Sequence, residues 1–160
     1  MPDLWQNRGM QPTKYIWMDG ELVDWDEATV HVLVHGLHYG TGAFEGIRAY
    51  EAEGGTAVFR LTEHMERLAR SCKALGIPVD WTVGELVAAS KELLALNGLT
   101  TGYIRPLVFY GTGSMGLNPA GASVHTVIAS WEWGAYLGEE GLANGIAVKV
   151  SSWRRIGQDA

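Results

Sequence analysis

Apolar residues change their spacing twice along this 160-residue chain, and the change limits the folds that it can adopt. Before Leu61, short runs rich in β-branched and aromatic residues alternate with glycines, a pattern typical of strands. From Leu61 to Leu75 apolar residues recur every three or four positions, and a second helical stretch begins at Thr82. Strand-type runs return after Thr101. Strands, two consecutive helices and further strands, without strict alternation, predict an α+β fold with the helices on a largely antiparallel or mixed sheet.

Turn residues delimit the expected strands. Asp19-Gly20 lies between two short apolar runs and predicts a tight hairpin, because both central residues of a type I′ turn take positive φ. Gly54-Gly55 is expected to turn the chain between two later strands. The remaining strands are expected at residues 29–34, 44–50, 56–61, 102–111, 123–131 and 145–153.

The two helices carry their own start and stop signals. Thr62 is expected to cap the first helix, and Gly76 ends it. Thr82 and Glu85 have the spacing of a capping box at the start of the second helix.

Charge and cysteine content restrict the partners and the compartment. The formal net charge of −6 gives no attraction to nucleic-acid phosphates or to an anionic membrane surface, so neither is an expected partner. The N-terminus lacks the apolar core of a signal peptide, and no apolar run is long enough to cross a bilayer. Cys72 is the single cysteine, which suits a reducing compartment, so we expect a cytoplasmic location.

Two motifs resemble ligand sites but are better explained by structure. Residues 111–116 match G-x-G-x-x-G, yet a proline follows closely where a dinucleotide site needs a helix, so we expect a loop. The five histidines could bind a metal, but their spacing matches no metal-binding motif. We expect no metal and structural hydrogen bonds from His31, His35, His38, His64 and His125.

Tyr103 and Arg105 lie two positions apart in an expected strand, so both side chains project from the same face. A guanidinium beside a phenol in an apolar strand is suited to binding a carboxylate with two hydrogen bonds. A structural ion pair with a helix glutamate is an equally good interpretation of these two residues alone.

Four motifs in order carry a family resemblance: HGLHYGTGAFEGIRAY, EHMERL, GYIRPLVFYGTGSMGLNP and WEWGAYLG. Together they resemble the N-terminal half of branched-chain amino-acid aminotransferases, which are fold-type IV pyridoxal-phosphate enzymes. The resemblance extends from Tyr15 to Trp153, and FEGIR and YIRP resemble these enzymes more than D-amino-acid aminotransferases or aminodeoxychorismate lyases. It implies the small N-terminal domain of the D-amino-acid-aminotransferase-like fold.

The resemblance also implies a division of the chain. Residues 1–136 would form the small domain, residues 137–145 the connector, and residues 146–160 the first strand of a large cofactor-binding domain. In the family, the lysine that forms a Schiff base with the cofactor follows the segment that these last residues resemble. That lysine would lie beyond Ala160, so the 160-residue chain alone is expected to be inactive.

Site residues follow from the same resemblance. Arg67 matches the family's ligand of the pyridoxal 5′-phosphate phosphate group, although a solvated helix arginine would look the same in sequence. Leu117 matches a loop residue that reaches the neighbouring subunit's site, which implies a homodimer. The positions implied to bind substrate are Tyr39, Phe44, Gly46, Arg48, Tyr103, Arg105, Leu117, Trp133 and Tyr136.

The activity implied is transamination of leucine, isoleucine and valine, with 2-oxoglutarate and glutamate as the second pair and branched-chain 2-keto acids as products. Apolar walls suit these substrates, because burying an aliphatic side chain is favourable by about 1.5–3 kcal/mol. Two alternatives remain open from the sequence. One is a non-catalytic short form that acts as a binding or dimerisation module, and the other is a related fold-type IV transaminase of different substrate range.

Overall fold

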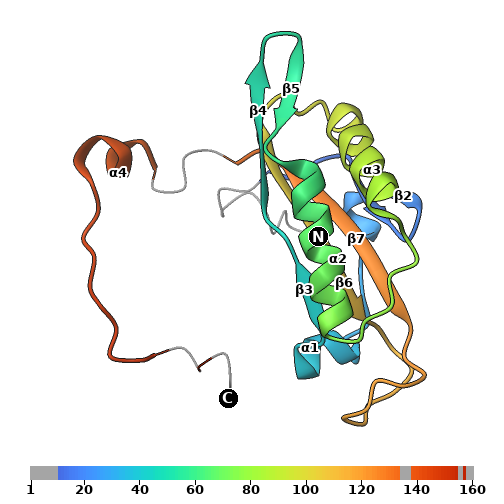
Figure 1. Ribbon diagram of the computed structural model, residues 1–160. Helices are drawn as coiled ribbons and strands as arrows, with labels where there is room; N and C mark the ends of the chain where they lie inside the picture. Colours follow the sequence, from blue (N-terminus) through green and yellow to red (C-terminus); the bar gives the residue numbers. More distant parts are fainter. Residues whose placement is uncertain (1–10, 134–137, 155–156, 158–160) are drawn as a thin grey trace.

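The computed structural model describes residues 11–133, 138–154 and 157, and within them one antiparallel sheet carries the fold. Its strands are ordered β2-β1-β7-β6-β4-β5, and β3 also pairs with β6. Figure 1 shows two helices, α2 (Leu61–Ala74) and α3 (Val83–Leu96), side by side on the sheet. The strands are β1 (Tyr15–Met18), β2 (Glu21–Asp24), β3 (Gly42–Phe44), β4 (Ile47–Ala52), β5 (Gly55–Val58), β6 (Gly102–Tyr110) and β7 (Val124–Trp131).

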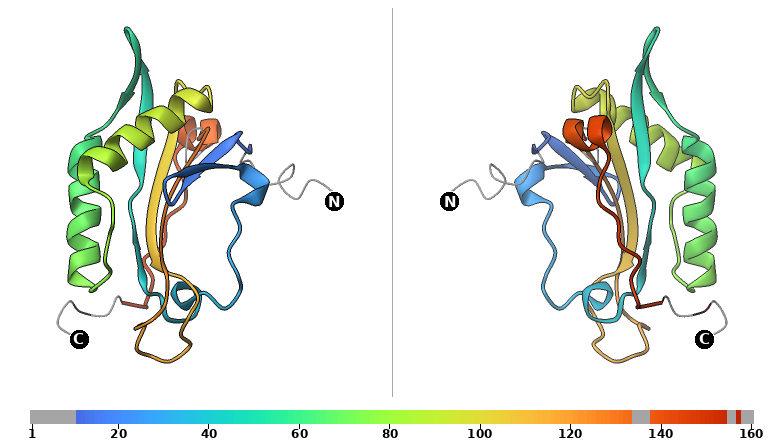
Figure 2. Two further views of the ribbon diagram at one scale, coloured as in Figure 1. Left: turned by 90° about the vertical axis from the view of Figure 1, so that its right-hand side faces the viewer. Right: turned by 90° about the vertical axis from the view of Figure 1, so that its left-hand side faces the viewer.

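The side views show that α2 and α3 cover one face of the sheet and leave its other face without either helix (Figure 2). This arrangement confirms the expected α+β fold and the two consecutive helices. The core lies between the helices and the covered face. Its most deeply buried members, each no more than 1% exposed, include Ile47, Ile104, Val108 and Ile128 from the sheet and Met65, Leu68, Leu86 and Leu93 from the helices.

Local turn and cap signals were reliable in several places. Asp19 and Gly20 take φ values of 51° and 96° in the β1–β2 hairpin, which confirms the expected turn. Thr82 accepts a hydrogen bond from the Glu85 backbone while the Glu85 side chain accepts one from Thr82, so the capping box is confirmed. The expected cap at Thr62 is wrong. The N-cap of α2 is Arg60, which has a φ of 48° and makes no side-chain cap bond.

The strand expected at residues 29–34 is also wrong. These residues connect a short 3-10 helix, η1 (Trp25–Glu27), to a five-residue helix, α1 (His35–Tyr39), and they pair with no strand in the described part of the chain. Val30, Val32 and Leu33 are 45–64% exposed, so these apolar residues are not buried against a sheet. The following residues, 35–39, are helical.

The expected strand at residues 44–50 is divided in two. β3 and β4 both pair with the edge of β6, and their registers are continuous, since Phe44 lies opposite Leu107 and Ile47 lies opposite Ile104. Between them, the Glu45 backbone N–H donates to the Pro106 carbonyl oxygen at 3.0 Å. Proline has no N–H to return the bond, so the ladder is interrupted while the register is kept.

The chain after the sheet does not form the strand expected at residues 145–153. A helix, α4 (Gly138–Asn144), precedes residues 145–154, which have no regular secondary structure. In Figure 1, α4 and the following residues lie apart from the sheet. A strand needs a hydrogen-bonded neighbour, and the described residues offer none here. Within the described ranges, no helix combines the length and apolarity that crossing a membrane would demand.

Candidate functional site

Strand β6 divides its side chains between the two faces of the sheet. Ile104, Pro106 and Val108 point toward the helices and are fully buried. Tyr103 and Arg105 point to the uncovered face and are partly exposed. The expectation that Tyr103 and Arg105 project together is therefore confirmed by their direct contact, a 3.3 Å hydrogen bond from Arg105 Nη2 to the Tyr103 oxygen.

The Arg105 guanidinium lies among aromatic rings. Its central carbon is 4.5 Å from the centroid of the Phe44 ring and 5.4 Å from that of Tyr103. Arg105 Nε is buried and has no hydrogen-bond partner, and no ion pair joins Arg105 to a helix glutamate among the described residues. A buried, unsatisfied N–H of a charged group is costly. Of the two interpretations of this arginine, the geometry favours the one in which it binds an external carboxylate.

Tyr103 is held in place from two sides. Its ring centroid lies 5.2 Å from that of Trp131 and 4.5 Å from that of Trp133. On the other side, a side chain at Gly46 would overlap the Tyr103 hydroxyl group. Gly46 is required here because the tyrosine oxygen approaches the backbone so closely. Phe44, Gly46, Tyr103, Arg105 and Trp133 thus form one contiguous group, which we call the Arg105 cluster.

Arg48 is the second cation on the uncovered face. It lies opposite Tyr103 in the register of β4 and β6, and its guanidinium is 5.6 Å from the centroid of the Tyr50 ring. The sheet therefore places Arg48 beside the Arg105 cluster, one strand away.

A groove with apolar walls lies next to the Arg105 cluster, where α1 and the chain before it cover part of β3 and β6. Its volume is about 360 Å³, and Phe44 belongs both to its wall and to the Arg105 cluster. An aliphatic group in the groove could therefore lie near a carboxylate on Arg105. The groove is lined by Val30, Val34, Gly36, Leu37, Gly40, Gly42, Phe44, Leu107 and Phe109.

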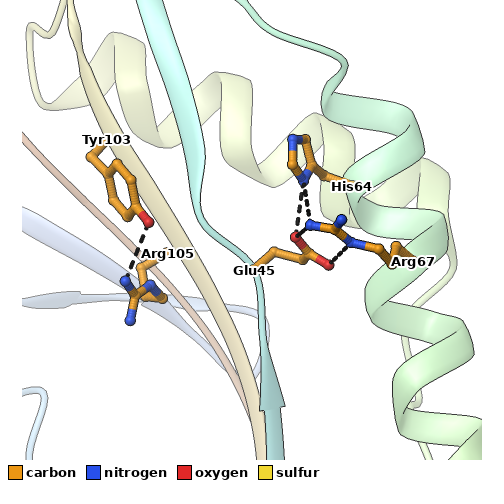
Figure 3. A network of polar contacts seen from close by, with 5 residues as sticks. All are labelled: Glu45, His64, Arg67, Tyr103 and Arg105. Atoms are coloured by element: carbon orange, nitrogen blue, oxygen red, sulfur yellow. Dashed lines mark hydrogen bonds and ion pairs between the residues drawn. The ribbon is translucent and has the colours of Figure 1, made fainter. Parts of the chain in front are cut away.

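Arg67 lies on the helix side of the β3–β4 edge, away from Arg105 (Figure 3). Its Nε and Nη2 donate to the two carboxylate oxygens of Glu45 at 2.6 and 2.5 Å. His64, one turn earlier on α2, contacts the same carboxylate through Nδ1 at 2.9 Å. Glu45 is only 5% exposed, whereas 59% of the Arg67 side chain is accessible. Arg67 is therefore neither a free surface residue nor fully enclosed.

The charge state of Glu45 follows from these contacts. Hydrogen bonds from Arg67 lower the pKa of the Glu45 carboxyl group, burial opposes the change, and the His64 hydrogen bond lowers the pKa further. Glu45 is consequently ionised at neutral pH and acts only as an acceptor. Sequence reasoning assigned no role to Glu45, and it treated His64 only as one of five structural histidines. The partners are 19 and 22 residues apart, so no local spacing indicated the contact.

Tyr39 and Leu117 lie at a third location. The Tyr39 hydroxyl donates to the Met115 carbonyl oxygen at 2.8 Å, which ties α1 to the loop after β6. Buried His35 also holds this loop, through a 2.8 Å contact with the Gly116 carbonyl oxygen. Leu117 is 84% exposed and projects from the loop. Among the described residues, no hydrogen bond, ion pair or ring contact joins Tyr39 or Leu117 to the Arg105 cluster, and Tyr136 lies outside the described residues.

The other two motifs considered in the sequence have structural roles. Residues 111–116 form a loop without a following helix, as expected. Each of the five histidines makes at least one hydrogen bond, with partners that include backbone groups, Thr41, Glu45 and Asp19. In the part of the chain that the structure describes, no group of three or more His, Cys, Asp or Glu side chains could hold a metal ion.

Comparison with known proteins places this geometry in a family. The profile of the family "Amino-transferase class IV" matches residues 42–160, so the chain belongs to the class IV aminotransferases. A branched-chain-amino-acid aminotransferase of Escherichia coli strain K12 is 51% identical over 142 residues, which is 88% of this chain and 46% of that protein. The resemblance stated from the sequence is thereby confirmed.

Solved structures agree with this assignment. A crystal structure of the Escherichia coli branched-chain enzyme has a TM-score of 0.88 and 49% identity, over 92% of this chain and 49% of that one. The branched-chain aminotransferase of Thermoproteus uzoniensis with norvaline has a TM-score of 0.82 and 41% identity, over 92% of this chain and 48% of that one. The branched-chain aminotransferase of Thermobaculum terrenum in its PLP form has a TM-score of 0.70 and 32% identity, over 80% of this chain and 43% of that one. This chain spans about half the length of the relatives that it matches.

Proposed function

We propose that this chain supplies the substrate-binding half of a pyridoxal-phosphate-dependent branched-chain amino-acid transaminase. The enzyme would exchange amino groups between leucine, isoleucine or valine and 2-oxoglutarate. The single observation that carries the proposal is the buried, unpartnered Nε of Arg105 beside an apolar groove. A cation with an unused donor next to aliphatic walls matches an α-amino or α-keto acid with a branched hydrocarbon side chain.

In this proposal the Arg105 cluster binds and orients the substrate. Arg105 holds the carboxylate that amino and keto acids share, and the Tyr103 hydroxyl fixes the guanidinium. Phe44 closes one side of Arg105 against water and forms the wall of the groove. Apolar contact there favours the branched side chains over polar ones. The norvaline bound to the Thermoproteus uzoniensis relative is also an aliphatic amino acid, which supports the choice of substrate class.

The residues present also fit the cofactor. Arg67 offers a guanidinium that is fixed on one side and accessible on the other, as a ligand of the phosphate group requires. When bound, pyridoxal 5′-phosphate supplies the carbonyl carbon that accepts the amino group and the ring that withdraws electrons. The four lysines of the chain, Lys14, Lys73, Lys91 and Lys149, are all exposed, so we place the lysine that attaches the cofactor outside these residues.

The same proposal includes the assembly and the division of the chain. Residues 1–136 would form the small domain, residues 137–145 the connector, and residues 146–160 the start of the large domain. Leu117 would reach the site of a second subunit in a cytoplasmic homodimer, for which its 84% exposure leaves it free. Arg48 and the residue Tyr136 would complete the substrate pocket.

The test is the kinetics of Arg105→Leu in the protein as its gene encodes it, with leucine and 2-oxoglutarate. Losing a charge-assisted hydrogen bond, about 1.5–3 kcal/mol, should raise KM for both substrates roughly ten- to hundredfold. Arg70→Leu is the matched control, because the Arg70 side chain is 68% exposed and lies 3.9 Å from Glu66. Unchanged KM values in a folded Arg105→Leu variant would refute the proposed role of Arg105.

A further inference from the structure

The Arg67 guanidinium has two edges, and Glu45 occupies one of them. Nε and Nη2 both donate to the Glu45 carboxylate, which is the side-on bidentate arrangement. The Nη1 hydrogens belong to the other edge and remain available to a ligand, because a guanidinium carries five N–H groups, whereas Nη2 also lies 3.5 Å from His64 Nδ1. With 59% of the side chain accessible, this second edge can meet a ligand.

Glu45 is itself fixed more firmly than a surface partner would be. It is 5% exposed, and its backbone N–H is bonded to the Pro106 carbonyl oxygen of β6. His64 contacts the carboxylate oxygen Oε2, which also accepts from Arg67. Since the carboxylate is ionised, His64 Nδ1 carries the proton in this contact. Glu45 therefore links the sheet to α2, through its backbone bond to β6 and its side-chain contacts with His64 and Arg67 (Figure 3).

We propose that Glu45 is the positioning residue for phosphate binding: its buried carboxylate clamps one edge of Arg67 and aims the other edge at the phosphate group of the cofactor. This inference rests on the proposed function, in which Arg67 is the phosphate ligand. It adds a residue that itself touches neither the cofactor nor the substrate.

Two effects of Glu45 oppose each other. Its negative charge cancels part of the positive field of Arg67 and so weakens the attraction of a phosphate dianion. Its two hydrogen bonds, however, fix a long side chain that would otherwise sample many rotamers on an accessible helix face. Salt screens the electrostatic effect of the Glu45 charge at this accessible site, but it does not change the orientation that Glu45 gives to the Arg67 donors. Positioning therefore outweighs the loss of field.

The experiment measures affinity rather than activity. The apo form of the protein, as its gene encodes it, is titrated with pyridoxal 5′-phosphate and with pyridoxal, which lacks the phosphate. Glu45→Gln keeps the shape of the side chain but loses its charge and its second acceptor oxygen. We expect Glu45→Gln to reduce the affinity ratio, which is the affinity for pyridoxal 5′-phosphate divided by that for pyridoxal, about tenfold. Losing a residue that positions a metal-binding side chain typically weakens metal affinity by a similar factor.

The matched control is Glu63→Gln. Glu63 lies on the same helix and in the same surface hollow as Arg67, but its carboxylate bonds to Arg60, at 2.9 Å. This variant should leave the affinity ratio unchanged. An equal loss for both compounds in Glu45→Gln would mean that Glu45 only supports the fold, and an unchanged or higher ratio would mean that its charge merely opposes the phosphate. Either result overturns the inference.

Arg67→Met separates a failure of this inference from a failure of the proposed function. If Arg67→Met leaves the affinity ratio unchanged, Arg67 is not the phosphate ligand and both ideas fail. If it lowers the ratio and Glu45→Gln does not, only the positioning role fails. Because Glu45 acts through Arg67, the double variant should bind no worse than Arg67→Met.

A second variant covers the case in which Glu45→Gln does not fold. Glu45→Asp keeps the charge but withdraws the carboxylate by one methylene group, so it cannot reach both Arg67 nitrogens in the same geometry. We expect a ratio several-fold below that of the unchanged protein, and an unchanged ratio would overturn the inference. Circular dichroism of each variant shows whether it has folded.

Discussion

The two faces of the sheet differ although they are built from the same strands. On the covered face, alternate residues of β6 are aliphatic or proline and are sealed by α2 and α3. On the other face, the intervening residues include Tyr103 and Arg105, and the latter carries a buried donor without a partner. One face therefore supplies stability, and the other carries an energetic cost that the proposed binding role of Arg105 would explain. Substitutions one residue apart should separate these two contributions.

The largest expected effect is on the covered face. Ile104 is fully buried between the sheet and the helices, so Ile104→Ala should lower the free energy of unfolding by about 2–5 kcal/mol through lost burial and a cavity. Leu107, on the other face of the same strand, is only partly buried, and Leu107→Ala should cost distinctly less. Urea unfolding of both variants measures the difference. Equal losses would show that the uncovered face contributes to stability as much as the covered face.

A smaller effect is expected where the backbone touches the Arg105 cluster. In Gly46→Ala the new methyl group would overlap the Tyr103 hydroxyl, so the ring or the backbone must shift. Overpacking of this kind typically costs about 1–3 kcal/mol. Thermal unfolding measures the loss, and a raised KM for leucine would report the displaced tyrosine. Gly84→Ala is the control, because Gly84 lies in α3 where an added methyl group is not obstructed.

The smallest effect on stability is expected at Arg105, despite its central position. Arg105→Met removes a donor that is already unsatisfied and retains an apolar stem against Phe44. The free energy of unfolding should change by no more than about 1 kcal/mol in either direction. Chemical denaturation of the variant checks this. A large loss of stability would mean that Arg105 supports the sheet, and the contrast between the two faces would fail.

The sequence predicted those parts of the fold that local chemistry determines. The Asp19-Gly20 turn, the Thr82 capping box and the strands around Tyr103 all depend on residues close together in the chain. The shared face of Tyr103 and Arg105 follows from the two-residue period of a strand alone. The family resemblance added the proposed phosphate-binding role of Arg67, which its position on a helix could not indicate.

Features set by distant partners were not predictable in this way. Residues 29–34 are as apolar as a strand, but whether they form one depends on a free sheet edge, which a pattern cannot show. The partner of Arg67 is Glu45, 22 residues earlier, and it becomes visible only when α2 is packed beside β3. The division of residues 44–50 into two strands depends on Pro106 in a strand that comes much later.

The two-residue gap between β3 and β4 has a consequence for how this protein can vary. Phe44 contacts Arg105, Glu45 contacts Arg67 and Gly46 makes room for Tyr103, and these three consecutive residues face alternate sides of the sheet. Inserting or deleting one residue would exchange the sides, so that the carboxylate met the aromatic rings and the ring met the helix. The hydrogen-bond ladder is interrupted in this gap, where Glu45 N–H donates to the Pro106 carbonyl oxygen, yet the length of the gap is as constrained as that of any strand. The Gly54-Gly55 turn faces open space instead, so an inserted residue should be tolerated there far better than in the gap.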